Sequence, residues 1–279
     1  MSYRKIGVIA LIMGLIPIGI TGCGKKREIK KIDFDKKIVL PVKVEEGVIR
    51  IAVSAMISPK ETFGYYRQIL DYMGEKIGKK VELVQRKTYA EVNELLKQEK
   101  IEAAFVCSGP YVAGKKDFGM ELLVAPQIYG KTVYYSYIIV HRDSPIKGFK
   151  ELEGKTFGFT DPLSHTGKLV PAYELTKIGK TPESYFAKYL YTYSHDNSIE
   201  AVADKIVDGA AVDHLIFEYL NAANHKYTSL TKVVERIGPF GIPPFVVHPK
   251  LDPELKNKIK EVLLNMHQDE KGKKILKQM

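Results

Sequence analysis

The chain has 279 residues, of which 45% are hydrophobic and 27% charged, a composition typical of a globular protein with a real core. Lys and Arg outnumber Asp and Glu by 43 to 33, so the formal net charge is +10. Only two cysteines are present, which excludes a small scaffold held together by several disulfides.

The first 22 residues are expected to be a targeting signal and not part of the fold. Arg4 and Lys5 precede an apolar run from Ile6 to Ile20, and small residues follow directly before Cys23. This pattern is typical of a secretory signal that is cut before a cysteine, which then carries lipid. A membrane span is the alternative, but the run is short for the ~20 residues that spanning requires. We therefore predict a lipoprotein signal peptide over 1–22 and lipidation of Cys23.

Residues 23–44 are predicted to form a lysine-rich tether next to the lipid. Export argues against nucleic acid as the partner, although a positive charge alone would also suit nucleic acid, an anionic membrane or small anions. With Cys23 consumed by lipid, Cys107 has no partner for a disulfide within the chain. A small buried hydrophobe is the usual role of such a cysteine, and a thiol ligand for arsenite is the alternative.

The folded part is expected to begin with alternating strands and helices, the pattern of a parallel sheet with crossover helices. In chain order we predict a strand at 48–53, a helix at 62–77, a strand at 81–85, a helix at 89–98, a strand at 103–106 and a loop at 107–111.

The same pattern starts afresh after about residue 133. Strands are predicted at 134–141, 156–159, 189–193, 209–212 and 244–247, with a helical turn at 147–152 and helices ending at 178, at 199–206 and from 253 onward. We therefore predict an α/β clamshell of two lobes, each a mixed, mostly parallel sheet flanked by helices.

The predicted first lobe comprises 45–132 and 236–279, and the second lobe comprises 133–235. The chain crosses between them twice, near 131–133 and again near 233–238, and these crossings act as hinges. Ligands of open parallel sheets lie beyond the carboxyl ends of the strands, which here face the cleft between the lobes.

The most informative segment is Thr160-Asp-Pro-Leu-Ser-His-Thr-Gly-Lys-Leu-Val-Pro171, between a predicted strand and a predicted helix. Pro171 cannot lie deep in a helix, so the helix is expected to begin near 167–168. Ser164, His165 and Thr166 then form its N-terminal edge, where free backbone N–H groups and hydroxyls suit an anion with several oxygens. Ordinary N-capping is the alternative.

Two further polar positions follow predicted strands. His195 lies in a loop before a helix, where it is either a donor to an anion or an exposed capping residue. Asp213 ends a strand of small residues, and a carboxylate near a bound anion is costly unless the ligand has a proton to donate. A helix N-cap is the alternative for Asp213. Tyr89, Tyr111 and Tyr134 are placed where their hydroxyls would reach the cleft, and an ordinary core or surface position is the alternative for each.

Enzyme and cofactor motifs are absent from the sequence. The segment around Ser164 does not match the Gly-Xaa-Ser-Xaa-Gly elbow of an esterase, so hydrolysis by Ser164, His195 and Asp213 is the weaker interpretation. No zinc-binding spacing and no phosphate-loop motif occurs either, so no metal and no cofactor is predicted.

The chain resembles the PhnD-like family of phosphate, phosphite and phosphonate substrate-binding proteins of ABC transporters. The resemblance lies in Ser108-Gly-Pro-Tyr111, in residues 134–146, in the Asp161–Pro171 run, in residues 194–203 and in residues 207–213. It implies the type II periplasmic-binding fold, no enzymatic activity, and capture of a small phosphorus oxyanion for an ABC permease and ATPase.

By this resemblance Ser164, His165 and Thr166 form the oxyanion-binding turn and His195 contacts the ligand oxygens. Tyr89 and Tyr134 reach in from the first lobe and the crossing strand, and Asp213 accepts the ligand's proton. The family's aminoalkyl-phosphonate binders carry acids where this chain has Leu215 and Pro243, so phosphite, phosphate or methylphosphonate is expected instead. His165, the middle residue of the oxyanion-binding turn, replaces the Ser or Thr that many members of the family carry there.

We expect a monomer held at the outer face of a membrane, or in the periplasm, by its lipid. A sensor that passes the ligand signal to a membrane kinase, for phosphorus oxyanions or for arsenite, is the alternative function.

Overall fold

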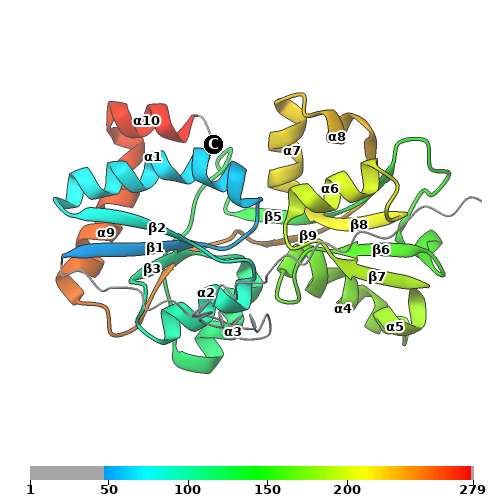
Figure 1. The fold of residues 1–279 in the computed structure, drawn as a ribbon, viewed down its shortest axis with the longest axis horizontal. Helices are drawn as coiled ribbons and strands as arrows, with labels where there is room; N and C mark the ends of the chain where they lie inside the picture. Colours follow the sequence, from blue (N-terminus) through cyan, green and yellow to red (C-terminus); the bar gives the residue numbers. More distant parts are fainter. Residues whose placement is uncertain (1–46, 278–279) are drawn as a thin grey trace, which may run out of the picture. The chain divides into compact units, whose positions relative to one another are not determined.

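A computed structural model describes residues 47–277, in which two five-stranded sheets form the cores of two lobes (Figure 1). The predicted signal peptide, Cys23 and nearly all of the tether lie outside the described residues. None of the described helices is long and apolar enough to cross a membrane.

The first lobe is built on the sheet β2-β1-β3-β10-β4. Its strands are β1 (Val48–Val53), β2 (Lys80–Gln85), β3 (Ala103–Phe105), β4 (Glu121–Val124) and β10 (Phe245–Val247). β2 and β3 lie parallel to β1, as the strand–helix alternation predicts, whereas β10 runs antiparallel to both β3 and β4. A strand from the end of the chain therefore completes the sheet that the beginning of the fold starts.

Helices cover both faces of this first sheet. They are α1 (Pro59–Ile77), α9 (Pro253–Asn265) and α10 (Glu270–Leu276) on one face, and α2 (Tyr89–Lys97) and α3 (Ser108–Phe118) on the other (Figure 1). Because side chains alternate along β1, Ile51 packs under α1 and α9 while Ala52 packs under α2. α1 ends where predicted, at Gly78, whose φ of 72° suits glycine.

The second lobe is built on the sheet β7-β6-β8-β5-β9. Its strands are β5 (Val133–His141), β6 (Thr156–Phe159), β7 (Lys188–Tyr191), β8 (Gly209–Asp213) and β9 (Thr231–Gly241). β6 is parallel to β7 and to β8, and β5 is antiparallel to β8 and β9. Both sheets are thus mixed, which confirms the predicted fold class.

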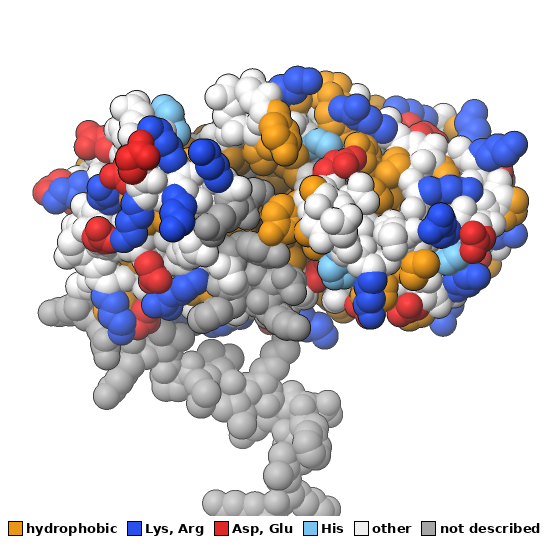
Figure 2. Space-filling view, turned by 90° about the horizontal axis from the view of Figure 1, so that it is seen from above, with side chains coloured by type: hydrophobic (Ala, Val, Ile, Leu, Met, Phe, Trp, Pro, Cys, Tyr) orange, Lys and Arg blue, Asp and Glu red, His pale blue; other side chains and the backbone are white. Residues whose placement is uncertain are grey.

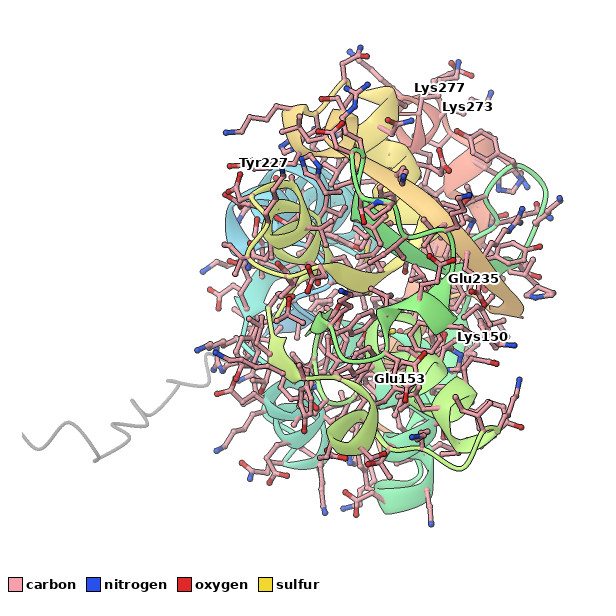
Figure 3. The ribbon with its side chains drawn as sticks, turned by 90° about the vertical axis from the view of Figure 1, so that its right-hand side faces the viewer. Lys150, Glu153, Tyr227, Glu235, Lys273 and Lys277 are labelled. Carbon is pink, nitrogen blue, oxygen red and sulfur yellow. The ribbon has the colours of Figure 1, made fainter. Side chains whose placement is uncertain are left out.

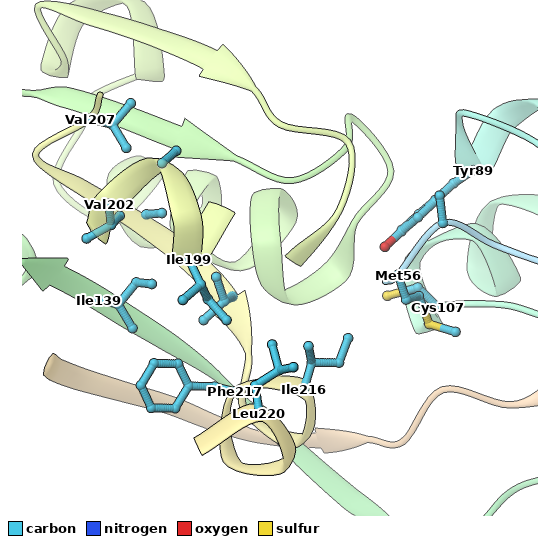
Figure 4. Packing of buried hydrophobic residues seen from close by; sticks show 14 residues of the cluster. Met56, Tyr89, Cys107, Ile139, Ile199, Val202, Val207, Ile216, Phe217 and Leu220 are labelled. Carbon is cyan, nitrogen blue, oxygen red and sulfur yellow. The ribbon is translucent and has the colours of Figure 1, made fainter. Parts of the chain in front are cut away.

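The helices of the second lobe also lie on both faces of their sheet (Figure 1). They are α6 (His195–Ala203), α7 (His214–Ala222) and α8 (Lys226–Ser229) on one face, and the π-helical turn η2 (His165–Leu169), α4 (Val170–Thr176) and α5 (Pro182–Tyr185) on the other. Figure 4 shows the aliphatic cluster under α6 and α7, and the same cluster continues to Met56, Tyr89 and Cys107 of the first lobe.

Two predicted segments differ in the structure. Residues 108–111 were expected in a loop, but they begin α3, because a proline costs little in a first turn whose N–H groups have no intrahelical acceptor. The expected return crossing near 233–238 is the edge strand β9, which accommodates Pro239 because β9 pairs only with β5 among the described strands.

Some of the charged side chains on the outside of the lobes form ion pairs. Figure 2 shows Lys, Arg, Asp and Glu intermingled over the first lobe, where Lys76 pairs with Asp269 at 2.7 Å and Lys271 with Glu75. At the edge of the second sheet, Glu235 accepts a hydrogen bond from Phe149 N–H at the start of the turn η1 (Phe149–Leu152), on the side where Figure 3 labels it. Positive and negative side chains are therefore mixed on this surface of the first lobe.

Candidate functional site

The predicted binding turn follows β6 directly and is tightly closed on itself. Ser164 is fully buried, and its Oγ accepts a hydrogen bond from Gly167 N–H at 3.1 Å, so the capping alternative holds for this side chain. The helical turn begins at His165, two residues earlier than predicted. A Cβ on Gly167 would lie 2.2 Å from Thr160 Oγ1, which explains why only glycine fits beneath the turn.

Buried polar atoms without a partner gather around this turn. In the described part of the chain, eight buried side-chain N or O atoms have no hydrogen-bond partner. Five of them form what we call the buried polar cluster: Ser54 Oγ, Tyr89 OH, His165 Nε2, Thr166 Oγ1 and His195 Nε2. Buried polar groups are rarely left unsatisfied, so such a concentration requires an explanation.

The cluster draws on both lobes, which hydrogen bonds join at this place. Ser54 follows β1 and Tyr89 begins α2, whereas the other three members belong to the second lobe. His195 N–H donates to Met56 O at 3.0 Å, and Tyr89 N–H donates to Asp161 Oδ2 at 3.1 Å. Burial raises the pKa of Tyr89 well above its ordinary value, and the nearby Ser164 side chain offsets only a small part of this, since no well-formed hydrogen bond joins the two hydroxyls.

His195 presents a hydrogen-bond donor to the cluster. Its Nδ1 accepts from Asp213 N–H at 3.1 Å, and because a backbone N–H can only donate, the ring proton resides on Nε2. Burial lowers the pKa of His195 to about 3, so the ring is neutral. His195 is fully buried as the first residue of α6, which contradicts the interpretation of an exposed loop histidine.

Asp213 lies beside His195 with its carboxyl group buried. Its Oδ1 accepts from Leu215 N–H at 2.8 Å, so the capping alternative is correct and Asp213 is the N-cap of α7. Burial nevertheless raises the pKa of Asp213 to about 7, since desolvation outweighs these backbone hydrogen bonds. Burial and the nearby Asp213 together raise the pKa of Tyr66 to about 12, so this carboxyl group is within electrostatic reach of the first lobe.

Tyr134 and Cys107 complete the surroundings. Tyr134 is fully buried in β5, with its hydroxyl 3.6 Å from Cys107 Sγ and its ring centroid 6.1 Å from that of His165. Burial raises the pKa of the Cys107 thiol, which favours the neutral form and therefore the role of a small hydrophobe. Tyr111, in contrast, packs against the apolar core beneath the first sheet and does not join this group.

The structure thus brings together all seven predicted site residues, which are Tyr89, Tyr134, Ser164, His165, Thr166, His195 and Asp213. The sequence prediction did not include Ser54, although its position directly after a parallel strand is the place where ligands of such sheets bind. His165, uncertain from the sequence, has its Nε2 buried and its ring 4.7 Å from that of Phe240. Among the described residues no group of three His, Cys, Asp or Glu side chains is placed to hold a metal ion.

Comparisons with known proteins show the family to which the chain belongs. The sequence pattern of the family described as "ABC transporter, phosphonate, periplasmic substrate-binding protein" matches residues 51–279. A phosphonates-binding periplasmic protein of Escherichia coli (strain K12) is 25% identical over 240 residues, covering 84% of this chain and 71% of the relative. The phosphate-import protein PhnD of Mycolicibacterium smegmatis is 25% identical over 272 residues, covering 93% and 81%.

Similarity extends to solved structures. The crystal structure of a binding-protein component of an ABC phosphonate transporter from Pseudomonas aeruginosa superposes with a TM-score of 0.78. It is 24% identical, and the match covers 84% of this chain and 79% of that one. At this identity the likeness establishes the fold alone, which is the type II periplasmic-binding fold.

Proposed function

We propose that this chain captures a phosphorus oxyanion bearing an ionisable proton, because it belongs to the family of phosphonate-type periplasmic substrate-binding proteins of ABC transporters. As a member of this family it is a transport component and not an enzyme, and a permease and an ATPase are its partners. The relatives bind phosphonates or import phosphate, and the proposal for this chain includes phosphite, phosphate and methylphosphonate.

The buried polar cluster is the observation that carries the proposal. An unsatisfied buried polar group costs roughly 1–3 kcal/mol, so five such atoms in one place would be a large penalty without a ligand. Hydroxyls of both lobes and the neutral imidazoles of the second lobe can donate to a tetrahedral anion. The Nε2–H of His195 is a certain donor among them, because the hydrogen bond to its Nδ1 fixes the tautomer. Ser164 accepts from Gly167 and keeps its own O–H to donate.

Asp213 makes the site selective for protonated ligands. A carboxyl group with a pKa of about 7 either accepts a proton from a monoanionic ligand or brings the proton itself to a dianion. Above pH 7 Asp213 is ionised and sulfate has no proton to share with it, so the two repel each other, whereas the phosphate dianion still carries a proton. The site is therefore expected to prefer phosphorus oxyanions over sulfate.

Aminoalkyl phosphonates are not the proposed ligands. An ammonium group would need a carboxylate partner, and the positions that supply one in such binders hold Leu215 and Pro243 here. The arsenite alternative is weak, because the Cys107 thiol that it would need is buried and its pKa is raised.

We further propose that the mature protein begins at Cys23 and is held at the membrane by lipid, as a monomer. The sequence pattern that ends at Cys23 supports this proposal. Cys23→Ser is expected to move the protein from the membrane fraction to the soluble fraction on cell fractionation. An unchanged membrane fraction would show that another element holds the protein.

The ligand is tested by calorimetric titration of the soluble form that starts after Cys23. Phosphite, phosphate, methylphosphonate, 2-aminoethylphosphonate, sulfate and arsenite are titrated separately. The proposal predicts micromolar or tighter binding of at least one of the first three, with sulfate, arsenite and the amine weak. Equal binding of sulfate would refute the role of Asp213, and an absence of heat with every phosphorus ligand would refute the ligand class.

A further inference from the structure

Asp161 joins the binding turn to the opposite lobe through both of its carboxylate oxygens. Oδ1 accepts from Leu163 N–H at 2.8 Å, within the turn of the second lobe. Oδ2 accepts from Tyr89 N–H at 3.1 Å, at the start of α2 in the first lobe. The side chain is only 1% exposed, so water does not compete for these two bonds.

The Tyr89 amide has no other acceptor available from its own helix. It belongs to the first turn of α2, whose N–H groups lack intrahelical partners, and the Thr88 side chain caps Glu91 N–H instead. A carboxylate at a helix N-terminus is also favoured by the helix dipole. The bond to Asp161 therefore fixes the position of Tyr89, whose hydroxyl belongs to the buried polar cluster.

We propose that Asp161 is a positioning residue for ligand capture, shaping the turn with one oxygen and holding Tyr89 against it with the other. The proposal rests on the proposed function, because the turn and Tyr89 are the groups that would contact the oxyanion. Since the two donors belong to different lobes, the second bond holds the lobes together in the arrangement that the structure shows. Asp161 thus stabilises the state that encloses the ligand and slows its release.

A neighbouring contact shows why Asp161 differs from other acids at the lobe junction. Asp196 also crosses between the lobes, with Oδ1 accepting from Ser58 N–H at 2.9 Å, but its side chain is partly exposed. Asp161, in contrast, is fully buried and accepts a hydrogen bond from each lobe, one on each oxygen.

Asp161→Asn separates the two roles, because an amide has one acceptor oxygen and cannot serve both Leu163 and Tyr89. Losing one hydrogen bond to a charged group corresponds to about a 10- to 100-fold weaker affinity. We expect this loss in stopped-flow measurements as faster dissociation of phosphite, phosphate or methylphosphonate, with the association rate little changed. Asp208→Asn is the control, because its Oδ2 alone accepts both bonds from Thr156 inside the second lobe.

Amide hydrogen exchange gives a second measurement that does not need a bound ligand. The Tyr89 amide should exchange at least tenfold faster in Asp161→Asn than in the wild type or in Asp208→Asn. Unchanged exchange and unchanged dissociation would overturn the proposal, as would an affinity loss that lies only in association. If the wild type binds none of the three ligands, the proposed function fails, whereas the exchange result still decides the role of Asp161. If Asp161→Asn does not fold, unprotected exchange of Tyr89 in the wild type would itself overturn the proposal.

Discussion

The buried Asp213 carboxyl group makes a strong prediction about the pH dependence of binding. In the proposed complex one proton is shared between Asp213 and the ligand. At a pH above the pKa values of both groups, free Asp213 and the free ligand are deprotonated, so binding must take up one proton. The pKa of Asp213 is about 7 because of burial. The ligand for this test is methylphosphonate, because its second ionisation is near neutrality and removes its last O–H, whereas the phosphate dianion keeps one. Affinity should then fall by about tenfold per pH unit, or ~1.4 kcal/mol, once the pH exceeds both values.

The variant Asp213→Asn tests this reasoning. Its amide oxygen can still accept from Leu215 N–H and so preserve the start of α7, while the amide N–H offers the ligand a donor in place of a charge. Affinity for methylphosphonate should therefore no longer fall between pH 7 and pH 9, over which the wild type loses up to about 100-fold.

Calorimetric titration of methylphosphonate in buffers of different ionisation enthalpy measures the proton uptake directly. The wild type should take up nearly one proton per ligand at pH 9, and Asp213→Asn nearly none. Asp208→Asn, which changes an exposed acid elsewhere in the same lobe, should behave as the wild type. A flat wild-type profile, or the same proton uptake in the wild type and in Asp213→Asn, would refute the role of Asp213.

Three further predictions concern stability and the shape of the turn. Because the pKa of Asp213 is 3.8 in the unfolded chain and about 7 in the folded protein, the free energy of unfolding should fall as the pH rises from about 4 to 7. Denaturant titration without ligand at pH 8 should therefore find Asp213→Asn more stable than the wild type, by at most ~4 kcal/mol. Tyr89→Phe removes a hydroxyl without a partner in the described structure, so thermal unfolding should show unchanged or higher stability while calorimetry shows affinity about tenfold lower; Tyr111→Phe should leave affinity unchanged. Gly167→Ala should lower the free energy of unfolding by about 1–3 kcal/mol and weaken binding, since its Cβ would lie 2.2 Å from Thr160 Oγ1; retention of both would show that the turn adjusts freely.

The spacing of apolar residues predicted much of the fold, because strands and helices have different periods. β1, α1 and β6 begin or end within a few residues of their predicted bounds, since each carries a clear apolar pattern and a Gly or Pro boundary. α3 was missed because Ser108-Gly-Pro110 looks like a loop when the tolerance of a first helical turn for proline is overlooked.

The sequence predicted which polar residues the structure brings together, but not which hydrogen bonds they form. The segments that contain Ser164 and Asp213 left open whether these side chains bind a ligand or cap their own helices, and in the structure both are caps. The tautomer of His195 depends on the backbone of Asp213, which lies 18 residues away. That contact arises only from the arrangement of the strands in the second lobe, and the bond between Asp161 and Tyr89 arises only where the two lobes meet.

The most direct test of the central claim is a crystal structure of the soluble form with its tightest-binding phosphorus oxyanion. The account predicts ligand oxygens about 2.7–3.2 Å from Tyr89 OH, Thr166 Oγ1 and His195 Nε2, with a protonated oxygen or its partner facing Asp213. A ligand bound elsewhere, with the buried polar cluster unchanged and still without partners, would contradict it.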